Sequence, residues 1–200
     1  MDEWFTIVVR QLILYSLPVV ISLTLVTMIE ARVSGKTSPH PFFAISWKGC
    51  WIPFFAALCF HRGVIIALPN PLSSGIRPAV VRFFVHALLC IIGFFLYAWS
   101  LSHQAPSGLP PLHHWWAKVL MYFNLCMVAL HLLPLPLLLV GELFANNALL
   151  RVLPPERRRS LSWIALSLFV ATPLLDLSLG AVVIYPVYEW LSSAAVQLAA

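Results

Sequence analysis

Four side chains that could do chemistry lie within long apolar runs: His86, His131, Glu142 and Asp176. Imidazoles on neighbouring helices can ligate a haem iron axially, and buried carboxylates can relay protons or contact a partner. The structural alternative is that the histidines hydrogen-bond backbone groups and that the acids hold proline kinks by pairing with protein groups. We expect the structural roles, because His86 is near one end of its run and His131 is in the middle of another.

The most specific pattern is the stretch from Asn124 to Gly141, NLCMVALHLLPLPLLLVG. It resembles the site-2 protease family of intramembrane zinc metalloproteases. In that family an Asn and a later Asn-Leu-Leu-Pro-x-Pro string form a segment that kinks at the prolines and delivers an aspartate ligand. The register is kept at Asn124, Leu132, Leu133, Pro134 and Pro136, His131 replaces the second Asn, and Gly141 closes the stretch.

Three other stretches extend the resemblance over about residues 20–190. Residues 31–36, which read ARVSGK, resemble the end of the helix that carries the family's metal-binding motif. Asn70 and Pro71 resemble the loop after its partial hairpin. Residues 153–155, Leu-Pro-Pro, with the arginines that follow, resemble the basic linker of small bacterial members.

The family's metal ligands do not carry over. Aligned on Gly35, the two histidine positions of the family's His-Glu-x-x-His motif hold Leu23 and Thr27, and the glutamate position holds Thr24. The position of the aspartate ligand holds Leu139. Zinc is held by Cys, His, Asp or Glu side chains, so none of these residues is a suitable ligand. The resemblance therefore implies a pseudoprotease with no catalytic residues, metal or cofactor. We expect a structural or regulatory subunit of a larger complex, with other integral membrane proteins and lipids as partners.

Two other functions stay open. A divergent intramembrane metalloprotease could recruit other ligands, such as His61 and Glu142. A haem- or quinone-associated electron-transfer subunit could use His86 and His131.

The elements that position these residues follow from the composition, which is 61% hydrophobic and 10% charged with a mean hydropathy of +0.91. Such a chain cannot build a water-facing surface. The uncharged stretches between Arg10 and Glu30 and between Lys118 and Glu142 can each cross about 30 Å of hydrocarbon. The net charge of +5 does not indicate nucleic acid binding, because basic residues stand at the ends of apolar runs.

The sequence predicts an all-α, polytopic transmembrane helical bundle that forms a single domain over residues 1–200. Four full spans are expected at about residues 5–30, 83–102, 115–150 and 161–191. Residues 51–68 are too short and too interrupted to span, so we expect a re-entrant or partial segment shielded by protein. Basic residues after the first span, among them Arg32 and Lys36, place its C-terminal end in the cytoplasm. The predicted location is the bacterial inner membrane, with the N-terminus outside.

Overall fold

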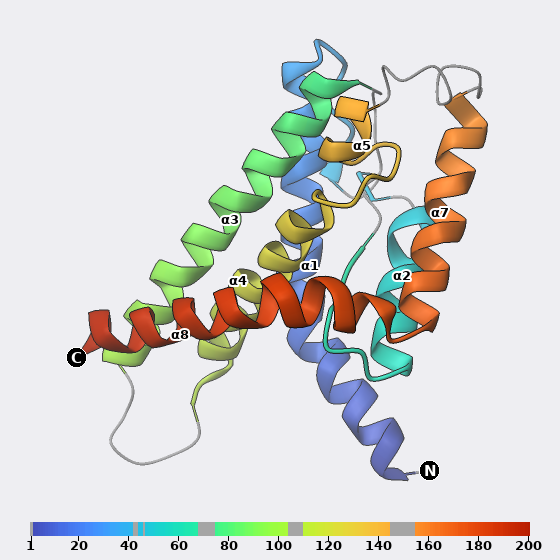
Figure 1. Ribbon diagram of the computed structural model, residues 1–200. Coiled ribbons are helices and arrows are strands. Elements are labelled where there is room, and N and C mark those ends of the chain that lie inside the picture. The colour runs from blue at the N-terminus through green and yellow to red at the C-terminus, as the bar shows by residue number, and fades with distance from the viewer. Residues whose placement is uncertain (1, 42–43, 46, 68–74, 104–109, 145–154) are drawn as a thin grey trace.

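The computed structural model describes the chain except for residues 1, 42–43, 46, 68–74, 104–109 and 145–154. The described part is helical and contains no strand, which confirms the predicted all-α class (Figure 1). Its elements are α1 (Asp2–Val33), α2 (Trp47–Cys59), α3 (Ile76–Ser102), α4 (Leu112–Leu130), α5 (Leu139–Phe144), α7 (Pro155–Ala171), the π-helix η2 (Asp176–Ile184) and α8 (Tyr185–Ala199).

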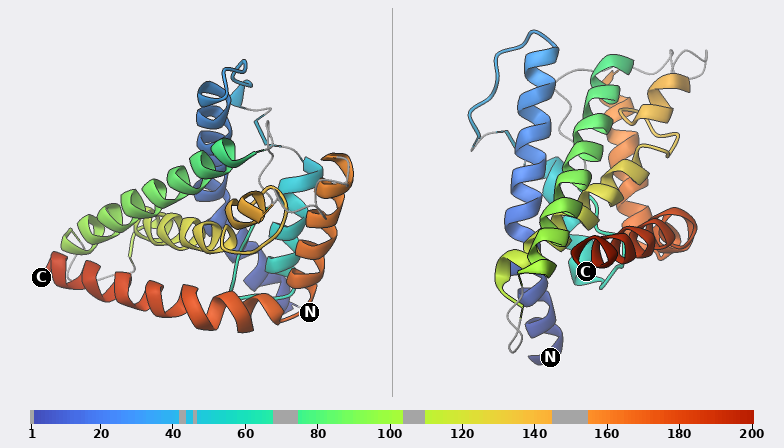
Figure 2. Two further views of the ribbon diagram at one scale, coloured as in Figure 1. Left: turned by 45° about the horizontal axis from the view of Figure 1, so that its top comes forward. Right: turned by 90° about the vertical axis from the view of Figure 1, so that its left-hand side faces the viewer.

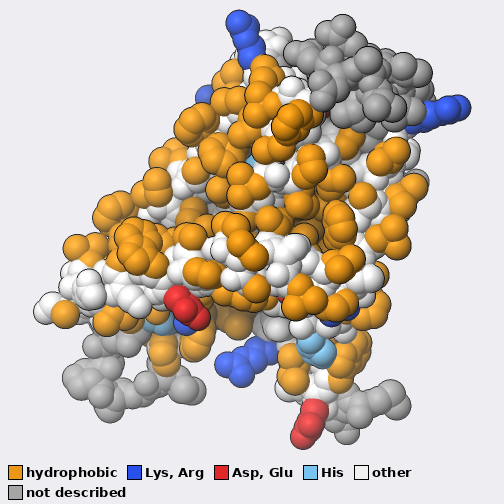
Figure 3. Space-filling view, in the orientation of Figure 1, with side chains coloured by type: hydrophobic (Ala, Val, Ile, Leu, Met, Phe, Trp, Pro, Cys, Tyr) orange, Lys and Arg blue, Asp and Glu red, His pale blue; other side chains and the backbone are white. Residues whose placement is uncertain are grey.

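Three helical stretches are long and apolar enough to cross a membrane, namely Glu3–Val33, Ile76–Ser102 and Asp176–Ala199. On α3, large apolar side chains spaced three or four residues apart are exposed along one face: Phe84, Leu88, Ile91, Phe95 and Trp99. Figure 3 shows apolar side chains over most of one face of the molecule, with charged side chains near its upper and lower ends. Because lipid is the solvent that such a surface requires, the chain is a membrane-embedded protein.

Helix α4 lies at the centre of the bundle, where it packs against α3, α1 and η2. A Cβ on Gly93 of α3 would come within 2.5 Å of the Met121 amide nitrogen of α4, so these two helices touch backbone to backbone. The predicted span 115–150 is not one helix, because α4 ends at Leu130 and α5 starts only at Leu139. Pro134 and Pro136 lie in the intervening turn, where they cannot donate helical hydrogen bonds. Residues 145–150 of this predicted span lie outside the described residues.

The segment predicted as re-entrant is a helix followed by an extended return. Helix α2 ends at Cys59, the chain reverses at His61 (φ 50°), and Val64–Ala67 run extended and buried towards the start of α3 (Figure 1). Backbone at membrane depth must have its polar groups satisfied by protein. The Val64 amide donates to Asp176 Oδ1 at 2.7 Å, and the Gly63 carbonyl accepts from the Tyr122 hydroxyl at 2.7 Å.

The predicted span 161–191 is also divided. Helix α7 ends at Ala171, and Pro173 separates it from η2 and α8. The structure turns sharply at this point, so that α7 runs beside α2 whereas α8 continues in a different direction (Figures 1 and 2). A proline removes one backbone donor and clashes with the preceding turn, which accounts for the break.

Candidate functional site

Six polar side chains form a buried polar cluster between α1, α3 and α4 and the turn after α4. They are at most 1% exposed: Ser22, Glu30, Arg82, His86, Asn124 and His131. Burying polar side chains costs desolvation free energy that apolar side chains would not. This cluster is therefore the candidate functional site of the described interior.

Asn124 connects three helices at the centre of this cluster. Its Oδ1 accepts a hydrogen bond from His86 Nδ1 at 2.7 Å, and its Nδ2 donates to Ser22 Oγ and to the Leu120 carbonyl, both at 2.8 Å. The Ser22 hydroxyl in turn donates to the Pro18 carbonyl at 2.7 Å. Because an amide oxygen only accepts, the proton of neutral His86 is on Nδ1 and its Nε2 carries a lone pair.

His131 lies beside His86, with ring centroids 6.3 Å apart. The expectation that one histidine is near the end of its run and the other in the middle is wrong as a statement of depth, because the two rings are neighbours in the structure. His131 follows the last residue of α4. The Leu139 amide donates to His131 Nδ1 at 3.2 Å, which leaves the proton of the neutral ring on Nε2. A metal-bound histidine donates a hydrogen bond from the ring nitrogen that does not bind the metal. His86 donates from Nδ1 in this way, whereas His131 accepts at Nδ1. The pair is therefore poorly arranged for axial haem ligation.

Arg82 and Glu30 form an ion pair inside the protein. The Arg82 Nη1 to Glu30 Oε1 distance is 2.9 Å, and each side chain is 1% exposed. Arg82 Nη2 also donates to the Leu137 carbonyl at 2.7 Å, so one guanidinium joins α1, α3 and the turn after α4. Nothing in the residue order indicates this pair beyond two opposite charges near the same end of two apolar runs. Arg82 is one of the basic residues that stand at the ends of such runs, and its structural role was missed.

The residues of the Asn124–Gly141 pattern meet in the turn after α4. Pro134 is exposed, whereas the buried Pro136 offers its carbonyl to the Ser162 hydroxyl of α7 at 2.8 Å. Leu137 has a φ of 73°, which is unusual for a residue with a side chain, and its amide donates to Glu142 Oε1 at 3.0 Å. A Cβ on Gly141 would overlap the carbonyl group of Leu135, so only glycine fits there. Glu142 thus closes this turn, as the structural reading of that acid predicts.

Asp176 lies apart from the buried polar cluster. Its Oδ1 accepts from the Val64 amide and from the Tyr185 hydroxyl, the latter at 3.1 Å. This carboxylate holds the extended return against η2, which agrees with the expectation that it pairs with protein groups. Arg151, a basic residue that could pair with these acids, lies outside the described residues.

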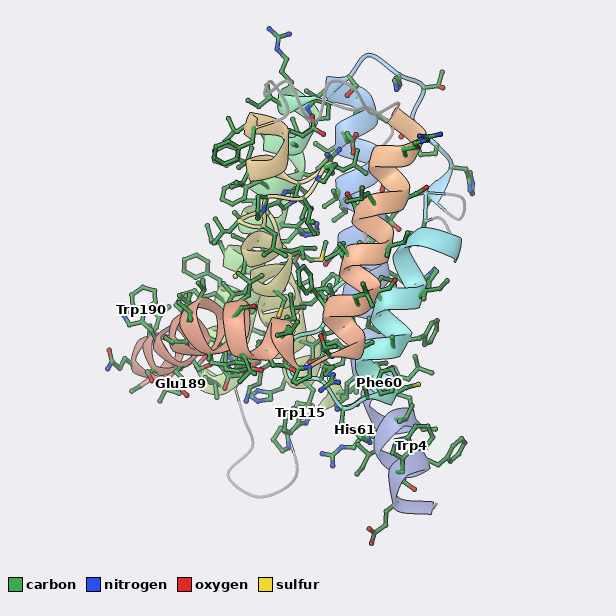
Figure 4. The ribbon with its side chains drawn as sticks, turned by 45° about the vertical axis from the view of Figure 1, so that its right-hand side comes forward. Trp4, Phe60, His61, Trp115, Glu189 and Trp190 are labelled. Carbon is green, nitrogen blue, oxygen red and sulfur yellow. The ribbon has the colours of Figure 1, made fainter. Side chains whose placement is uncertain are left out.

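The ligands considered for a divergent metalloprotease are not brought together. His61 is exposed at the turn after α2, where its ring lies 6.1 Å from that of Trp4 near the lower end of the molecule (Figure 4). Glu142 is in α5, at the upper end (Figure 1).

The family's own ligand positions do not fit a zinc ion either. Leu23 and Thr27 are buried one helical turn apart on α1, and Thr24 is half-buried beside them. The Thr27 hydroxyl donates to the Leu23 carbonyl at 2.8 Å, and Leu139 contributes its amide to His131. Among the described residues, no three His, Cys, Asp or Glu side chains gather where they could hold a metal ion.

Replacing Asn124 by alanine tests whether the buried polar cluster stabilises the fold. The change leaves the His86 Nδ1–H group without its acceptor, and a buried unsatisfied group costs about 1–3 kcal/mol. We expect a clearly lower thermal midpoint in detergent than for Ser178→Ala, whose exposed hydroxyl bonds only within its own helix. Equal midpoints for the two variants would show that the hydrogen bonds of Asn124 contribute nothing.

Comparisons of the chain with protein-family models, with curated proteins and with solved structures found no match.

Proposed function

We propose that this chain is a catalytically inactive, site-2-protease-like membrane protein that acts as a structural or regulatory subunit of a larger membrane complex. One observation carries the proposal. The positions that the resemblance assigns to the metal ligands hold Leu23, Thr27 and Leu139, and they adjoin a buried polar cluster whose groups bond helices to one another. Polar groups used in this way stabilise a shape, and they offer no activated water or nucleophile.

The outer surface supports a role in binding. The exposed face of α3, defined above by Phe84, Leu88, Ile91, Phe95 and Trp99, is broad and apolar. Helices of another membrane protein can pack against such a face by van der Waals contact, in competition with lipid. Aromatic side chains on it offer large contact areas at a small cost in side-chain entropy.

The proposed location is the bacterial inner membrane with the N-terminus outside. Basic residues stand at the C-terminal end of α1 and the N-terminal ends of α3 and α7, among them Arg32, Lys36, Arg77 and Arg157. These helix ends lie together at the upper end of the molecule in Figure 1. The positive-inside rule assigns that end to the cytoplasm.

Purification at native expression levels tests the subunit role. We expect the tagged chain to co-purify in fixed stoichiometry with one membrane protein, and that protein, tagged in turn, to recover this chain. Substituting Phe95 and Trp99 of α3 with serine should weaken the association, whereas the same change at the exposed Val182 of η2 is the matched control. Isolation of the chain as a stable monomer from its native membrane would contradict the proposal.

Metal and pigment analysis of the same preparation separates the alternatives. Stoichiometric zinc, together with cleavage of a membrane-spanning peptide that a chelator abolishes, would establish a divergent protease instead. A Soret band that His86→Ala and His131→Ala both remove would establish haem binding by these two histidines and favour the electron-transfer alternative. We expect neither signal.

A further inference from the structure

Helix α8 lies across the bundle. It runs crosswise to α1 and α7 in two views at right angles to each other, at the level where α3 ends and α4 begins (Figures 1 and 2). By length and composition alone, the stretch Asp176–Ala199 is a candidate membrane span. A helix that crosses the bilayer would have to run roughly along its neighbours, and α8 does not.

The side chains of α8 divide into three strips along its length. Tyr188, Leu191 and Ala195 face the protein, and Ala195 is fully buried. One exposed strip begins with the polar Glu189 and Ser193 and has the apolar Val196 as a neighbour, whereas the exposed Pro186 and Gln197 lie between this strip and Trp190 around the helix. The other exposed strip carries apolar side chains: Val187, Trp190 and Leu198, with Trp190 68% exposed.

Glu189 and Trp190 lie on opposite edges of α8. In Figure 4, Glu189 is on the lower edge of α8, the edge nearer to Trp115 and His61, and Trp190 is on its upper edge. The lower edge faces the end where the N-terminus lies (Figure 1). The upper edge faces the apolar middle of the bundle. A helix that lies flat at a lipid surface needs a polar edge towards water and an apolar edge towards the acyl chains. A spanning helix needs no such difference between its two edges.

The surroundings of α8 have the composition of a membrane interface. Lys118 of α4 has its ammonium group 5.8–6.0 Å from the ring centroids of Tyr97, Trp115 and Tyr188, the last of these on α8. Tyrosine and tryptophan concentrate at the boundary between headgroups and hydrocarbon, and lysine places its charge there.

We propose that α8 does not cross the membrane and instead lies in the lipid–water interface as an amphipathic helix. Its Trp190 strip contacts the parts of the acyl chains that adjoin the headgroups, and its Glu189 strip faces headgroups and water. Helix α7 returns the chain from the upper to the lower end of the molecule (Figure 1), so the C-terminus is on the same side of the membrane as the N-terminus. The ligand of this surface is the lipid headgroup layer. The inference depends only on the membrane location and is independent of the proposed function.

Cysteine labelling along α8 tests this arrangement. In a chain whose four native cysteines are changed to alanine, single cysteines replace Val187, Glu189, Ser193, Gln197 and Leu198 in turn. A membrane-impermeant maleimide is added to sealed vesicles of known orientation, with Glu3→Cys and Lys36→Cys marking the two sides. We expect Glu189→Cys and Ser193→Cys to label from the Glu3 side, and Val187→Cys and Leu198→Cys to be at least tenfold slower.

A spanning helix gives a different pattern, since labelling would then depend on position along the helix and not on the strip. Gln197→Cys and Leu198→Cys would both label from the Lys36 side, with Glu189→Cys and Ser193→Cys protected, and this result would overturn the proposal. If the cysteine-free chain does not fold, a reporter fused to the C-terminus of the unaltered chain decides the sidedness. A C-terminus on the side opposite to the N-terminus again contradicts the interfacial placement.

Discussion

Arg82→Met is expected to unfold most of the protein. The substitution removes the cation from a pair in which both side chains are 1% exposed, and it leaves the Glu30 carboxylate in the interior without that cation. Breaking one side of a buried pair costs about 3–5 kcal/mol, which is a large fraction of the roughly 5–15 kcal/mol that stabilises a folded domain. The Leu137 carbonyl loses its donor as well, so the turn after α4 is loosened. Thermal unfolding in detergent, followed by tryptophan fluorescence, measures the loss.

Two further variants separate the effect of charge from the effect of packing. The double variant Glu30→Met with Arg82→Met removes both charges, and replacement of a whole buried pair by apolar residues is often nearly neutral. We therefore expect the double variant to be more stable than Arg82→Met alone. Arg77→Met, at an exposed position of the same helix, is the control and should change the midpoint little. A double variant no better than the single one would show that Arg82 acts mainly through the Leu137 carbonyl.

Gly141→Ala should be the next most damaging change. The added Cβ would overlap the backbone carbonyl of Leu135, which cannot rotate away as a side chain could. The turn between α4 and α5 would have to open, and inserted methyl groups in tight interiors cost about 1–3 kcal/mol or more. Because His131 receives the Leu139 amide across this same turn, the imidazole pair would lose its geometry too.

Leu143→Ala is the matched control for this substitution, because Leu143 lies in the same short helix with its side chain exposed. The two variants are compared by their unfolding midpoints and by the accessibility of Cys126, which is fully buried in α4. We expect Cys126 to react faster only in Gly141→Ala. If both variants resemble the unaltered protein, the turn is not as tight as the contacts at Gly141 indicate.

Much of the fold could be predicted from residue order, because apolar runs and prolines act locally. The short and interrupted sequence of residues 51–68 predicted that they do not form one long spanning helix. The structure has there a helix and a buried return. Pro134 and Pro173 could be identified in the sequence as positions that disturb a helix, but the predicted spans did not end there. Each divides a predicted span, because the chain changes direction at that point and does not merely kink.

The site could be predicted only in part. Asn124, His131 and Gly141 were singled out by a pattern, and the structure joins Asn124 to His86 through a hydrogen bond across two helices. Ser22 and the Arg82–Glu30 pair were missed, because each interacts with a residue far away in the sequence. The spacing of apolar residues along one helix does not indicate such contacts between helices. The direction of α8 was equally inaccessible, since composition cannot distinguish a helix that spans from one that lies flat.

The extended return at Val64–Ala67 has a consequence for how the protein is made. Its Val64 amide is satisfied by Asp176, which a ribosome synthesises 112 residues later. Before Asp176 has been synthesised, the Val64 amide lacks the acceptor that it has in the folded protein, and water can accept its hydrogen bond instead. We therefore expect the return segment to take its final place only after α7 and η2 have been synthesised.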